Sequence, residues 1–373
     1  MALILTEEQQ MLRDSARDFL SGRAPISHLR SLRDEENPDR MSRELWAEMV
    51  ELGWPAILVP EEFGGLDYGY AGLGIVLEEC GRTLTPSPLL STSLTGVSAI
   101  IAAGSDEQRA EFLPRLASGE ILLALACDES SRHDPTVVTT MATPVDNGYR
   151  LDGQKVGVCD GHVAACLIVS AATENGTSLF LVPADADGVS VERVAMLDIA
   201  ATANIKLTGV EVSSDQLLGD EGSGAAVLEQ ILDAARVGVS AELLGLAQEA
   251  FGRTVEYIKE RKQFGVTVGI FQGLQHRAAK LYAEIELCKS LVIKALQTLD
   301  EQPGGDAELI SATKAKLCET AHTAANEAIQ MHGGIGMTDE FDIGFFLKRC
   351  QILESLYGDR YYHTERFAKL RNY

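Results

Sequence analysis

Positive charge and long apolar runs are both scarce in this sequence of 373 residues. Only 32 Lys and Arg face 55 Asp and Glu, which gives a net charge of −23. Such an excess repels phosphate backbones and anionic lipid, so it argues against nucleic acid and membrane surfaces as partners. No apolar run reaches the roughly 20 residues that span a bilayer, and the first residues lack the pattern of a secretory signal. We therefore expect a cytoplasmic protein without membrane insertion.

Paired cysteines and clustered histidines are also missing. The seven cysteines are an odd number and form no C-x-x-C, and the seven histidines form no H-E-x-x-H. This pattern argues against a disulfide framework and against a metal centre. We expect free thiols in a reducing compartment, most of them packed as small core residues. The cysteines are Cys80, Cys127, Cys159, Cys166, Cys288, Cys318 and Cys350.

The composition is that of a folded protein, and the periodicity of its apolar residues changes twice along the chain. Apolar residues make up 46 % and charged residues 23 %. These values are typical of globular domains, and the length suggests two or three of them. Residues 1–120 have helical periodicity, residues 121–221 alternate in short strands, and residues 222–373 return to long helices. We predict three domains with these boundaries, in the order α, β, α.

Local patterns support this order. Thr6 and Gln9 have the spacing of a capping box, which predicts a helix that begins at once and continues through Leu20. Residues 148–158 alternate around Asp152–Gly153, which predicts a β-hairpin with its turn there. Short strands at regular intervals predict a small barrel or sandwich, and the long helices that follow predict an antiparallel bundle.

Two segments of the last region carry chemistry. The first is ERKQFG at residues 260–265, where Arg261 offers a planar fork of donors suited to a diphosphate. The same letters also fit a helix that ends in a basic turn capped by Gly265, which the local pattern favours. The second is QMHGGIGM at residues 330–337, whose glycines either cap a long helix or let a ligand approach the backbone closely. His332 beside them is expected to be a buried histidine satisfied by backbone.

Together these segments resemble the acyl-CoA dehydrogenase family of flavoproteins. The resemblance covers nearly the whole chain, because PEEFGGLDYGYAGLGIVLEECGR, YRLDGQKVGV and LLGDEGSG also match the family's signatures in order. It implies the acyl-CoA dehydrogenase fold, with an N-terminal all-α domain, a middle β-barrel or sandwich domain and a C-terminal four-helix-bundle domain. The domain order predicted above from periodicity agrees with this fold.

The resemblance implies FAD-linked α,β-desaturation of an acyl-CoA thioester, in fatty-acid or steroid side-chain β-oxidation. A carboxylate removes the α proton, flavin takes the β hydrogen as hydride, and electron-transfer flavoprotein is the expected electron acceptor. The base must be desolvated and well placed, because the proton is weakly acidic. In the family each FAD lies between subunits. The middle domain of one chain holds the flavin ring, and the last domain of a neighbour contacts the diphosphate.

This chain matches the two halves of that cofactor site unequally. In the ring-binding half, Asp128 stands where a hydroxyl faces the flavin, and a carboxylate there opposes the anionic reduced ring. Gly157 removes an aromatic ring that stacks on flavin, and Cys159 replaces a threonine hydroxyl with a weaker donor. The diphosphate half is intact, and its cofactor-binding residues are Arg261, Gln263, Phe264, Gln272, Gln330, Gly333 and Gly334.

The family's catalytic glutamate is missing, because its position holds Gly358. Some relatives place the base just before an arginine on an earlier helix, but here Ala235 precedes Arg236. Asp359 and Glu242 remain as candidate bases. Asp359 also fits a solvated helix end, and Glu242 also fits a structural ion pair.

Two residues match the family's substrate-binding end. Arg236 corresponds to an arginine near the substrate, and a surface ion pair with Asp233 is the alternative. Tyr357 keeps the aromatic residue before the base position, and it also fits a core residue.

The leading hypothesis is a subunit of a heteromeric α2β2 acyl-CoA dehydrogenase that lends the FAD diphosphate half-site to a homologous partner carrying the base. The alternatives are a self-sufficient homotetrameric dehydrogenase, or related flavin oxidase, that uses Asp359 or Glu242, and a flavin-free scaffold subunit.

Overall fold

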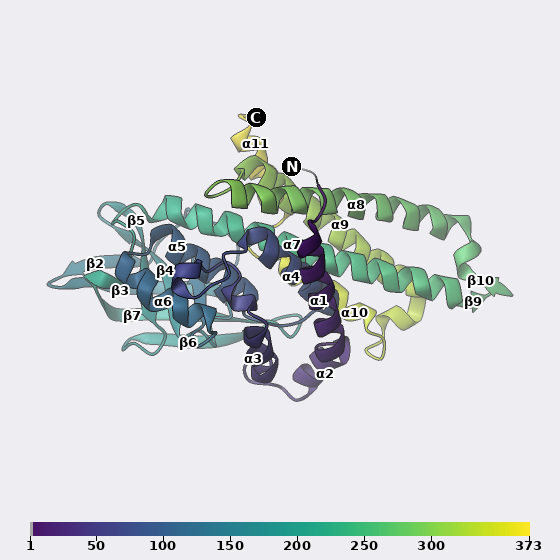
Figure 1. Ribbon diagram of the computed structural model, residues 1–373, viewed down its shortest axis with the longest axis horizontal. Helices are drawn as coiled ribbons and strands as arrows, with labels where there is room; N and C mark the ends of the chain where they lie inside the picture. The colour runs from purple at the N-terminus through teal and green to yellow at the C-terminus, as the bar shows by residue number, and fades with distance from the viewer. Residues whose placement is uncertain (1–2) are drawn as a thin grey trace. The chain divides into compact units, whose positions relative to one another are not determined.

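The computed structural model describes residues 3–373 (Figure 1). The chain forms two compact units. A helical unit comprises Met1–Ser31, Gly74–Thr85 and Arg236–Tyr373, and a sheet unit comprises Leu32–Leu73 and Pro86–Ala235. No helix within the described part of the chain has the length and apolar character needed to cross a membrane.

Helices dominate the first 120 residues, as predicted. The capping box at the first helix is present, because Gln9 N donates to Thr6 Oγ1 at 3.2 Å and Thr6 N donates to Gln9 Oε1 at 3.0 Å. A fully buried π-helix, η3 (Leu89–Gly96), leads into the fifth α-helix. The α-helices are α1 (Glu7–Arg23), α2 (Ile26–Asp34), α3 (Arg43–Glu51), α4 (Gly69–Thr83), α5 (Val97–Ala103) and α6 (Asp106–Ala117).

The strands of the middle region form one sheet of eight in the order β6-β7-β3-β2-β4-β5-β8, with β1 paired in parallel to β4. Apolar side chains that alternate along β3, β4, β5 and β7 build its core, among them Leu151, Val169 and Phe180. The strands are β1 (Leu123–Ala126), β2 (Met141–Val145), β3 (Gly148–Cys159), β4 (Cys166–Thr173), β5 (Gly176–Pro183), β6 (Val189–Ala195), β7 (Ala201–Ser213) and β8 (Leu217–Leu218).

The predicted turn at Asp152–Gly153 is wrong. Strand β3 runs unbroken through both residues, and its pairing with β7 shifts register there, as at a bulge. The Asp152 carboxylate accepts a hydrogen bond from Gly209 N at 2.7 Å, and a Cβ at Gly153 would lie 2.7 Å from the Thr140 Cα. The Asp-Gly pair therefore serves close packing inside the sheet, and the hairpin turn lies at residues 146–147, between β2 and β3.

The last region is helical, as predicted. Helix α9 contacts α8, α10 and α11. Gly265 is not the cap of α7, which corrects that expectation: α7 ends at Glu260 and a short hairpin of β9 and β10 follows. The elements are α7 (Gly224–Glu260), β9 (Lys262–Gln263), β10 (Val266–Thr267), η5 (Val268–Ile270), α8 (Gln272–Glu301), α9 (Ala307–His332), η6 (Gly333–Met337), α10 (Ile343–Ser355) and α11 (Arg360–Leu370).

The cysteines behave as expected. All seven are free thiols, and six of them are buried, while Cys159 is half-buried. Burial raises the pKa of the Cys166 thiol to about 12, so it is inert at neutral pH. Among the described residues no group of His, Cys, Asp and Glu has the arrangement of a metal site.

Candidate functional site

The ERKQFG segment forms an exposed hairpin at the end of α7 (Figure 1). Its two turn residues, Phe264 and Gly265, have φ of +57° and +80°, which suits a two-residue turn between twisted strands. Phe264 is 89 % exposed at the tip, and its ring meets the Phe271 ring edge-on with centroids 6.2 Å apart. Arg261 and Gln263 are exposed as well. A strongly exposed aromatic ring among unburied donors is a surface ready for a ligand or another chain.

The glycine segment at the end of α9 lies next to this hairpin's base. Tyr257 connects the two, because its carbonyl accepts from Arg261 N at 2.8 Å and its hydroxyl donates to the His332 carbonyl at 3.3 Å. Gly333 has φ of +66° and caps α9, as predicted. Added Cβ atoms at Gly333 and Gly334 would meet nothing within 4 Å, so the backbone here is open to close approach.

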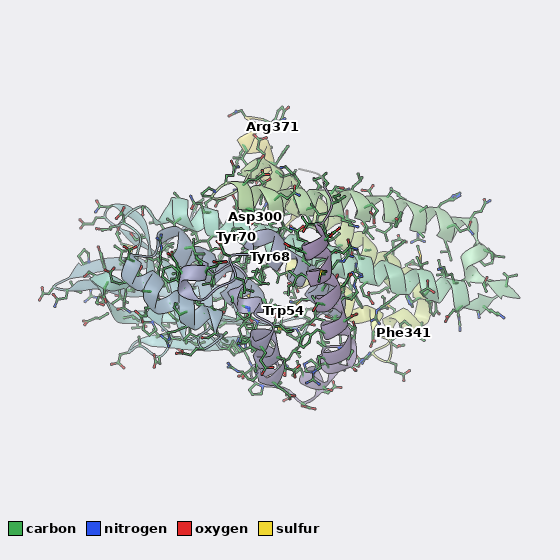
Figure 2. All side chains as sticks on the ribbon, viewed as in Figure 1. Trp54, Tyr68, Tyr70, Asp300, Phe341 and Arg371 are labelled. Atoms are coloured by element: carbon green, nitrogen blue, oxygen red, sulfur yellow. The ribbon has the colours of Figure 1, made fainter. Side chains whose placement is uncertain are left out.

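His332 is a core residue, as expected. Its Nδ1 lies 2.6 Å from the Ala328 carbonyl, and its ring stacks on Tyr257 at 4.2 Å. Phe341, labelled in Figure 2, completes the aromatic cluster at 5.0 Å from His332. Burial lowers the pKa of His332, so the ring is neutral.

Gln272 and Gln330, the remaining expected diphosphate contacts, are both exposed. Gln272 opens α8 directly after the hairpin, and Gln330 lies in the last turn of α9, before Gly333. The structure therefore gathers the motif residues at one end of the helical unit through Tyr257, the hairpin and the start of α8.

The expected ring-binding residues lie in the sheet unit, where the loop after β1 is closed on itself. The Asp128 carboxylate lies 2.8 Å from His133 Nδ1 and accepts from Asp134 N at 3.3 Å. The His133 side chain is only 5 % exposed. Both Asp128 oxygens are thus engaged within the loop.

The neighbouring Glu129 anchors the same loop. It accepts from Lys155 Nζ at 2.7 Å and from Thr140 N at 3.0 Å, and Lys155 is fully buried. Burial of the carboxylate opposes its ionisation, but the hydrogen bonds from Lys155, Thr139 and Thr140 outweigh it and lower the pKa of Glu129 to about 2.

Gly157 and Cys159 occupy the expected ring-stacking and hydroxyl positions. Gly157 has φ of +66° and open space around its Cα, so no side chain is present there to stack on a ring. The Cys159 thiol lies 3.7 Å from the Asp160 carboxylate, which also accepts from the Ser91 hydroxyl at 2.6 Å. The weak thiol donor is therefore aimed at a carboxylate.

The expected base position is a tight buried turn between α10 and α11. Tyr357 and Gly358 have φ of +58° and +105°, and both residues are buried. The Tyr357 carbonyl accepts from Arg236 Nε at 3.3 Å, and the Gly358 carbonyl accepts from Lys314 Nζ at 2.9 Å. Arg236 is fully buried and Asp233 is 4 % exposed, which argues against the alternative of a pair on the helix surface.

The two candidate carboxylates both have structural partners. Asp359 is the exposed N-cap of α11 and accepts from Tyr361 N at 2.9 Å and Tyr362 N at 2.8 Å. Glu242 is 3 % exposed and accepts from Arg349 Nε at 3.0 Å and Nη2 at 2.6 Å. These contacts favour the solvated helix end and the structural ion pair over the two catalytic interpretations.

Sequence reasoning missed the polar core around the turn, above all Lys314 and His363, which are both fully buried. The sequence offers one sign of Lys314. It stands four residues after Ile310 and three before Leu317, in the apolar stripe of α9.

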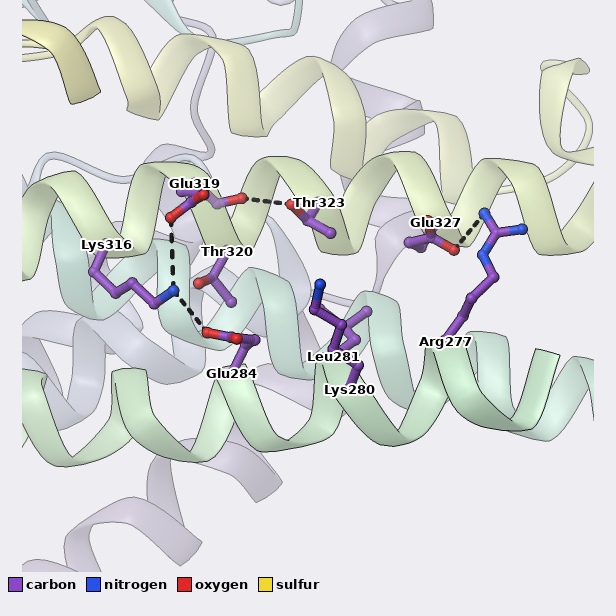
Figure 3. A pocket seen from close by; sticks show the side chains of 9 residues that line it. All are labelled: Arg277, Lys280, Leu281, Glu284, Lys316, Glu319, Thr320, Thr323 and Glu327. Carbon is purple, nitrogen blue, oxygen red and sulfur yellow. Dashed lines mark hydrogen bonds and ion pairs between the residues drawn. The ribbon is translucent and has the colours of Figure 1, made fainter. Parts of the chain in front are cut away.

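A pocket of about 290 Å3 lies between α8 and α9 (Figure 3). Its charges are matched internally, because Lys316 pairs with Glu284 at 2.6 Å and Arg277 pairs with Glu327 at 2.6 Å. This balance leaves little net attraction for an anionic ligand.

Two family models match the chain. The acyl-CoA dehydrogenase N-terminal domain matches residues 6–120, and the acyl-CoA dehydrogenase C-terminal domain matches residues 222–370. The acyl-CoA dehydrogenase FadE12 of Mycobacterium tuberculosis is 30 % identical over 365 residues, which cover 94 % of this chain and 92 % of the relative. Among solved structures, a variant of the Tcur3481-Tcur3483 steroid ACAD is 32 % identical over 98 % of both chains with a TM-score of 0.89. Butyryl-CoA dehydrogenase of Megasphaera elsdenii is 25 % identical over 100 % of both chains with a TM-score of 0.92.

Proposed function

This chain belongs to the acyl-CoA dehydrogenase family, whose cofactor is FAD, and from that premise we propose that it is one subunit of a heteromeric α2β2 enzyme. In this proposal it supplies the diphosphate half of the FAD site to a homologous partner that carries the catalytic base. The observation that carries the proposal is the contrast between an open diphosphate half in the helical unit and a ring half closed by its own residues in the sheet unit.

The diphosphate half fits its group. Arg261 would hold the diphosphate through charge-assisted hydrogen bonds, because its side chain is exposed at the base of the hairpin. Gly333 and Gly334 would let the cofactor approach the backbone. Phe264 is exposed enough to pack on a planar group from another chain.

The ring half does not fit an isoalloxazine. The family's hydroxyl is replaced by the Asp128 carboxylate, which His133 and Asp134 N already engage. Gly157 offers no stacking surface, and Cys159 is a weak donor aimed at Asp160. An anionic reduced ring would meet negative charge where it needs donors. No step of the reaction is therefore assigned to this half.

Among the residues that the structure describes, no carboxylate occupies the family's base position. Gly358 has no side chain, Asp359 caps a helix and Glu242 is held by Arg349. Bound FAD supplies the acceptor for the substrate's β hydrogen. In this proposal the chain's own residues bind and orient the cofactor, and the proton is removed by a carboxylate of the partner.

The proposal also covers the substrate, the electron acceptor and the cellular location. The substrate is an acyl-CoA, and a steroid acyl group is supported by the 32 % identity to the Tcur3481-Tcur3483 steroid ACAD. Electron-transfer flavoprotein is the proposed acceptor and the cytoplasm the proposed location, both on the resemblance of the chain to its family.

The test is to purify the chain alone and together with a homologue that retains the glutamate. We expect no 450 nm flavin absorbance and no acyl-CoA desaturation from the chain alone, and one FAD per heterodimer with turnover from the pair. One FAD per subunit and turnover from the chain alone would refute the proposal and support a homo-oligomeric enzyme. A flavin-free pair would instead support the scaffold alternative.

A matched pair of variants locates the cofactor contact. Arg261→Ala in the pair should weaken FAD binding about tenfold, the change expected for one charge-assisted contact of roughly 1.5 kcal/mol, and should lower occupancy in proportion at FAD concentrations well below Kd. Lys259→Ala removes an exposed cation two residues earlier, which pairs with Glu256, and should leave occupancy unchanged. Equal occupancy in both variants would place the diphosphate elsewhere.

A further inference from the structure

The turn at Tyr357–Gly358 has a conformation that few residues tolerate. Tyr357 is a buried aromatic residue with φ of +58°, a region that costs free energy for residues other than glycine. Gly358 follows with φ of +105°, which L side chains rarely adopt. The surroundings must therefore hold this turn in place.

Two buried cations hold it. Lys314 Nζ donates to the Gly358 carbonyl at 2.9 Å and to the Leu353 and Glu354 carbonyls at 3.1 Å each, so it ties the end of α10 to the turn. Arg236 Nε donates to the Tyr357 carbonyl at 3.3 Å. Both side chains are 0 % exposed, so moving the turn would cost each buried cation an acceptor.

Two side chains of α11 fill the space beside Gly358. A Cβ at position 358 would lie 2.4 Å from Tyr362 Cδ1 and 2.9 Å from His363 Nε2, both shorter than real contacts allow. These groups cannot easily withdraw. The Tyr362 hydroxyl accepts from Arg236 Nη2 at 3.2 Å, and His363 Nε2 lies 3.1 Å from the Tyr357 carbonyl.

The imidazole of His363 is neutral and fixed in one tautomer. Burial, and then the positive charges of Lys314 and Arg236, lower its pKa to about 2. Because a carbonyl only accepts, Nε2 must carry the proton. His363 therefore acts as a donor to the turn and has little basicity of its own.

We propose that Tyr362 and His363 close the base position, so that Gly358 and Tyr362 are coupled and a carboxylate cannot be restored at position 358 by one substitution. Tyr362 is the positioning residue that decides what fits there, because its ring makes the shortest contact. This inference rests on the proposed function, in which this chain does not carry the base, and names the residues that enforce it.

The first test is a thermal double-mutant cycle on the full chain in the oligomeric form in which it purifies. Gly358→Ala should lower Tm by roughly 5 °C or more, from backbone strain and the clash together. Gly64→Ala is the matched control, since Gly64 also has positive φ, +82°, but nothing within 4 Å of an added Cβ. The Tm of Gly64→Ala should fall by clearly less than that of Gly358→Ala.

The partner of the clash is then identified by truncation. Tyr362→Ala should make Gly358→Ala much less harmful, whereas Tyr362→Phe keeps the ring and should give no relief. Additive losses in both backgrounds, or a Gly358→Ala loss equal to that of Gly64→Ala, would overturn the inference.

The second test uses the glutamate itself. Gly358→Glu should lower Tm by at least as much as Gly358→Ala, and adding Tyr362→Ala should recover part of that loss. A Gly358→Glu loss that Tyr362→Ala leaves unchanged would overturn the inference. The Tm cycle needs no flavin, so it can fail while the FAD and turnover test of the heteromeric role succeeds, and the reverse.

Discussion

Replacing Glu242 with glutamine separates a structural ion pair from a catalytic base. Glu242 is 3 % exposed, and one of its oxygens accepts both Nε and Nη2 of Arg349 at 3.0 and 2.6 Å. Glutamine keeps an acceptor and the shape of the side chain, but it removes the carboxylate charge that faces the Arg349 guanidinium. We expect Glu242→Gln to destabilise the protein while any turnover of the complex persists.

The size of the effect follows from the burial of both partners. Removing one partner of a buried pair costs about 3–5 kcal/mol. The retained neutral hydrogen bond returns about 1 kcal/mol of that, which leaves an expected loss of about 2–4 kcal/mol. The Arg349 side chain is 13 % exposed, so slight hydration places the value toward the lower end. The double variant Glu242→Leu with Arg349→Met removes both charges and should recover most of the loss.

The measurement is urea unfolding of Glu242→Gln and of the double variant, beside desaturation by the complex. A stability within about 0.5 kcal/mol of the parent protein, together with a loss of turnover beyond about a hundredfold, would refute the structural assignment. That result would indicate that Glu242 is a functional acid, and it would support the alternative of a self-sufficient homo-oligomeric enzyme.

Two further predictions concern the cap of α11 and the response to acid. Asp359→Asn should leave stability unchanged and Asp359→Ala should cost about 0.5–2 kcal/mol, because Asn caps as well as Asp, and neither should change turnover of the complex; a loss of turnover in the Asn variant would contradict the capping role. Acid should destabilise the fold in two stages, measured as urea midpoints from pH 7 to pH 3. The pKa of His363 is about 2 in the folded protein, below its ordinary 6.5. Between these values the imidazole is protonated in the unfolded chain but not in the folded protein. The free energy of unfolding therefore decreases as the pH is lowered from 6.5. The pKa of Glu129 is also about 2, below its ordinary 4.5, so its contribution is present at neutral pH and is lost from about pH 4.5 downward. His363→Phe should flatten the first stage, and an unchanged slope there would contradict its assignment.

The sequence predicts elements well where the signal is local. The Thr6–Gln9 capping box and the change from α to β and back all appear as expected, because caps and periodicity depend on neighbours within a few residues. The prediction fails at Asp152–Gly153 and at Gly265. In both cases the same residues are compatible with two backbone conformations. Pairing of β3 with the distant β7 decides at Asp152–Gly153, and pairing of β9 with the following β10 decides at Gly265.

The site divides in the same way. Arg261 and Gly333 are exposed, each directly after the end of a long helix, and their place in the FAD site stays a prediction. Lys314 and His363 could not be predicted, because their partners are backbone carbonyls contributed by a distant turn. A buried lysine that is paired with an acid can be suspected from an acidic residue at a matching position in the sequence. Lys314 instead donates to backbone carbonyls, which every residue has, so the sequence gives no such sign.

The buried charges have a consequence for assembly. Among the described residues, the charged residues that are buried comprise three cations and three anions. The cations are Arg236, Lys155 and Lys314, and the anions are Glu79, Asp233 and Glu242. The charges of these buried residues balance, so the net charge of −23 is carried by half-buried and exposed residues. Two copies of this chain repel one another over the Debye length of about 8–10 Å before any contact forms. Added salt should therefore speed the encounter of acidic subunits, the opposite of its effect on interfaces built from complementary charge.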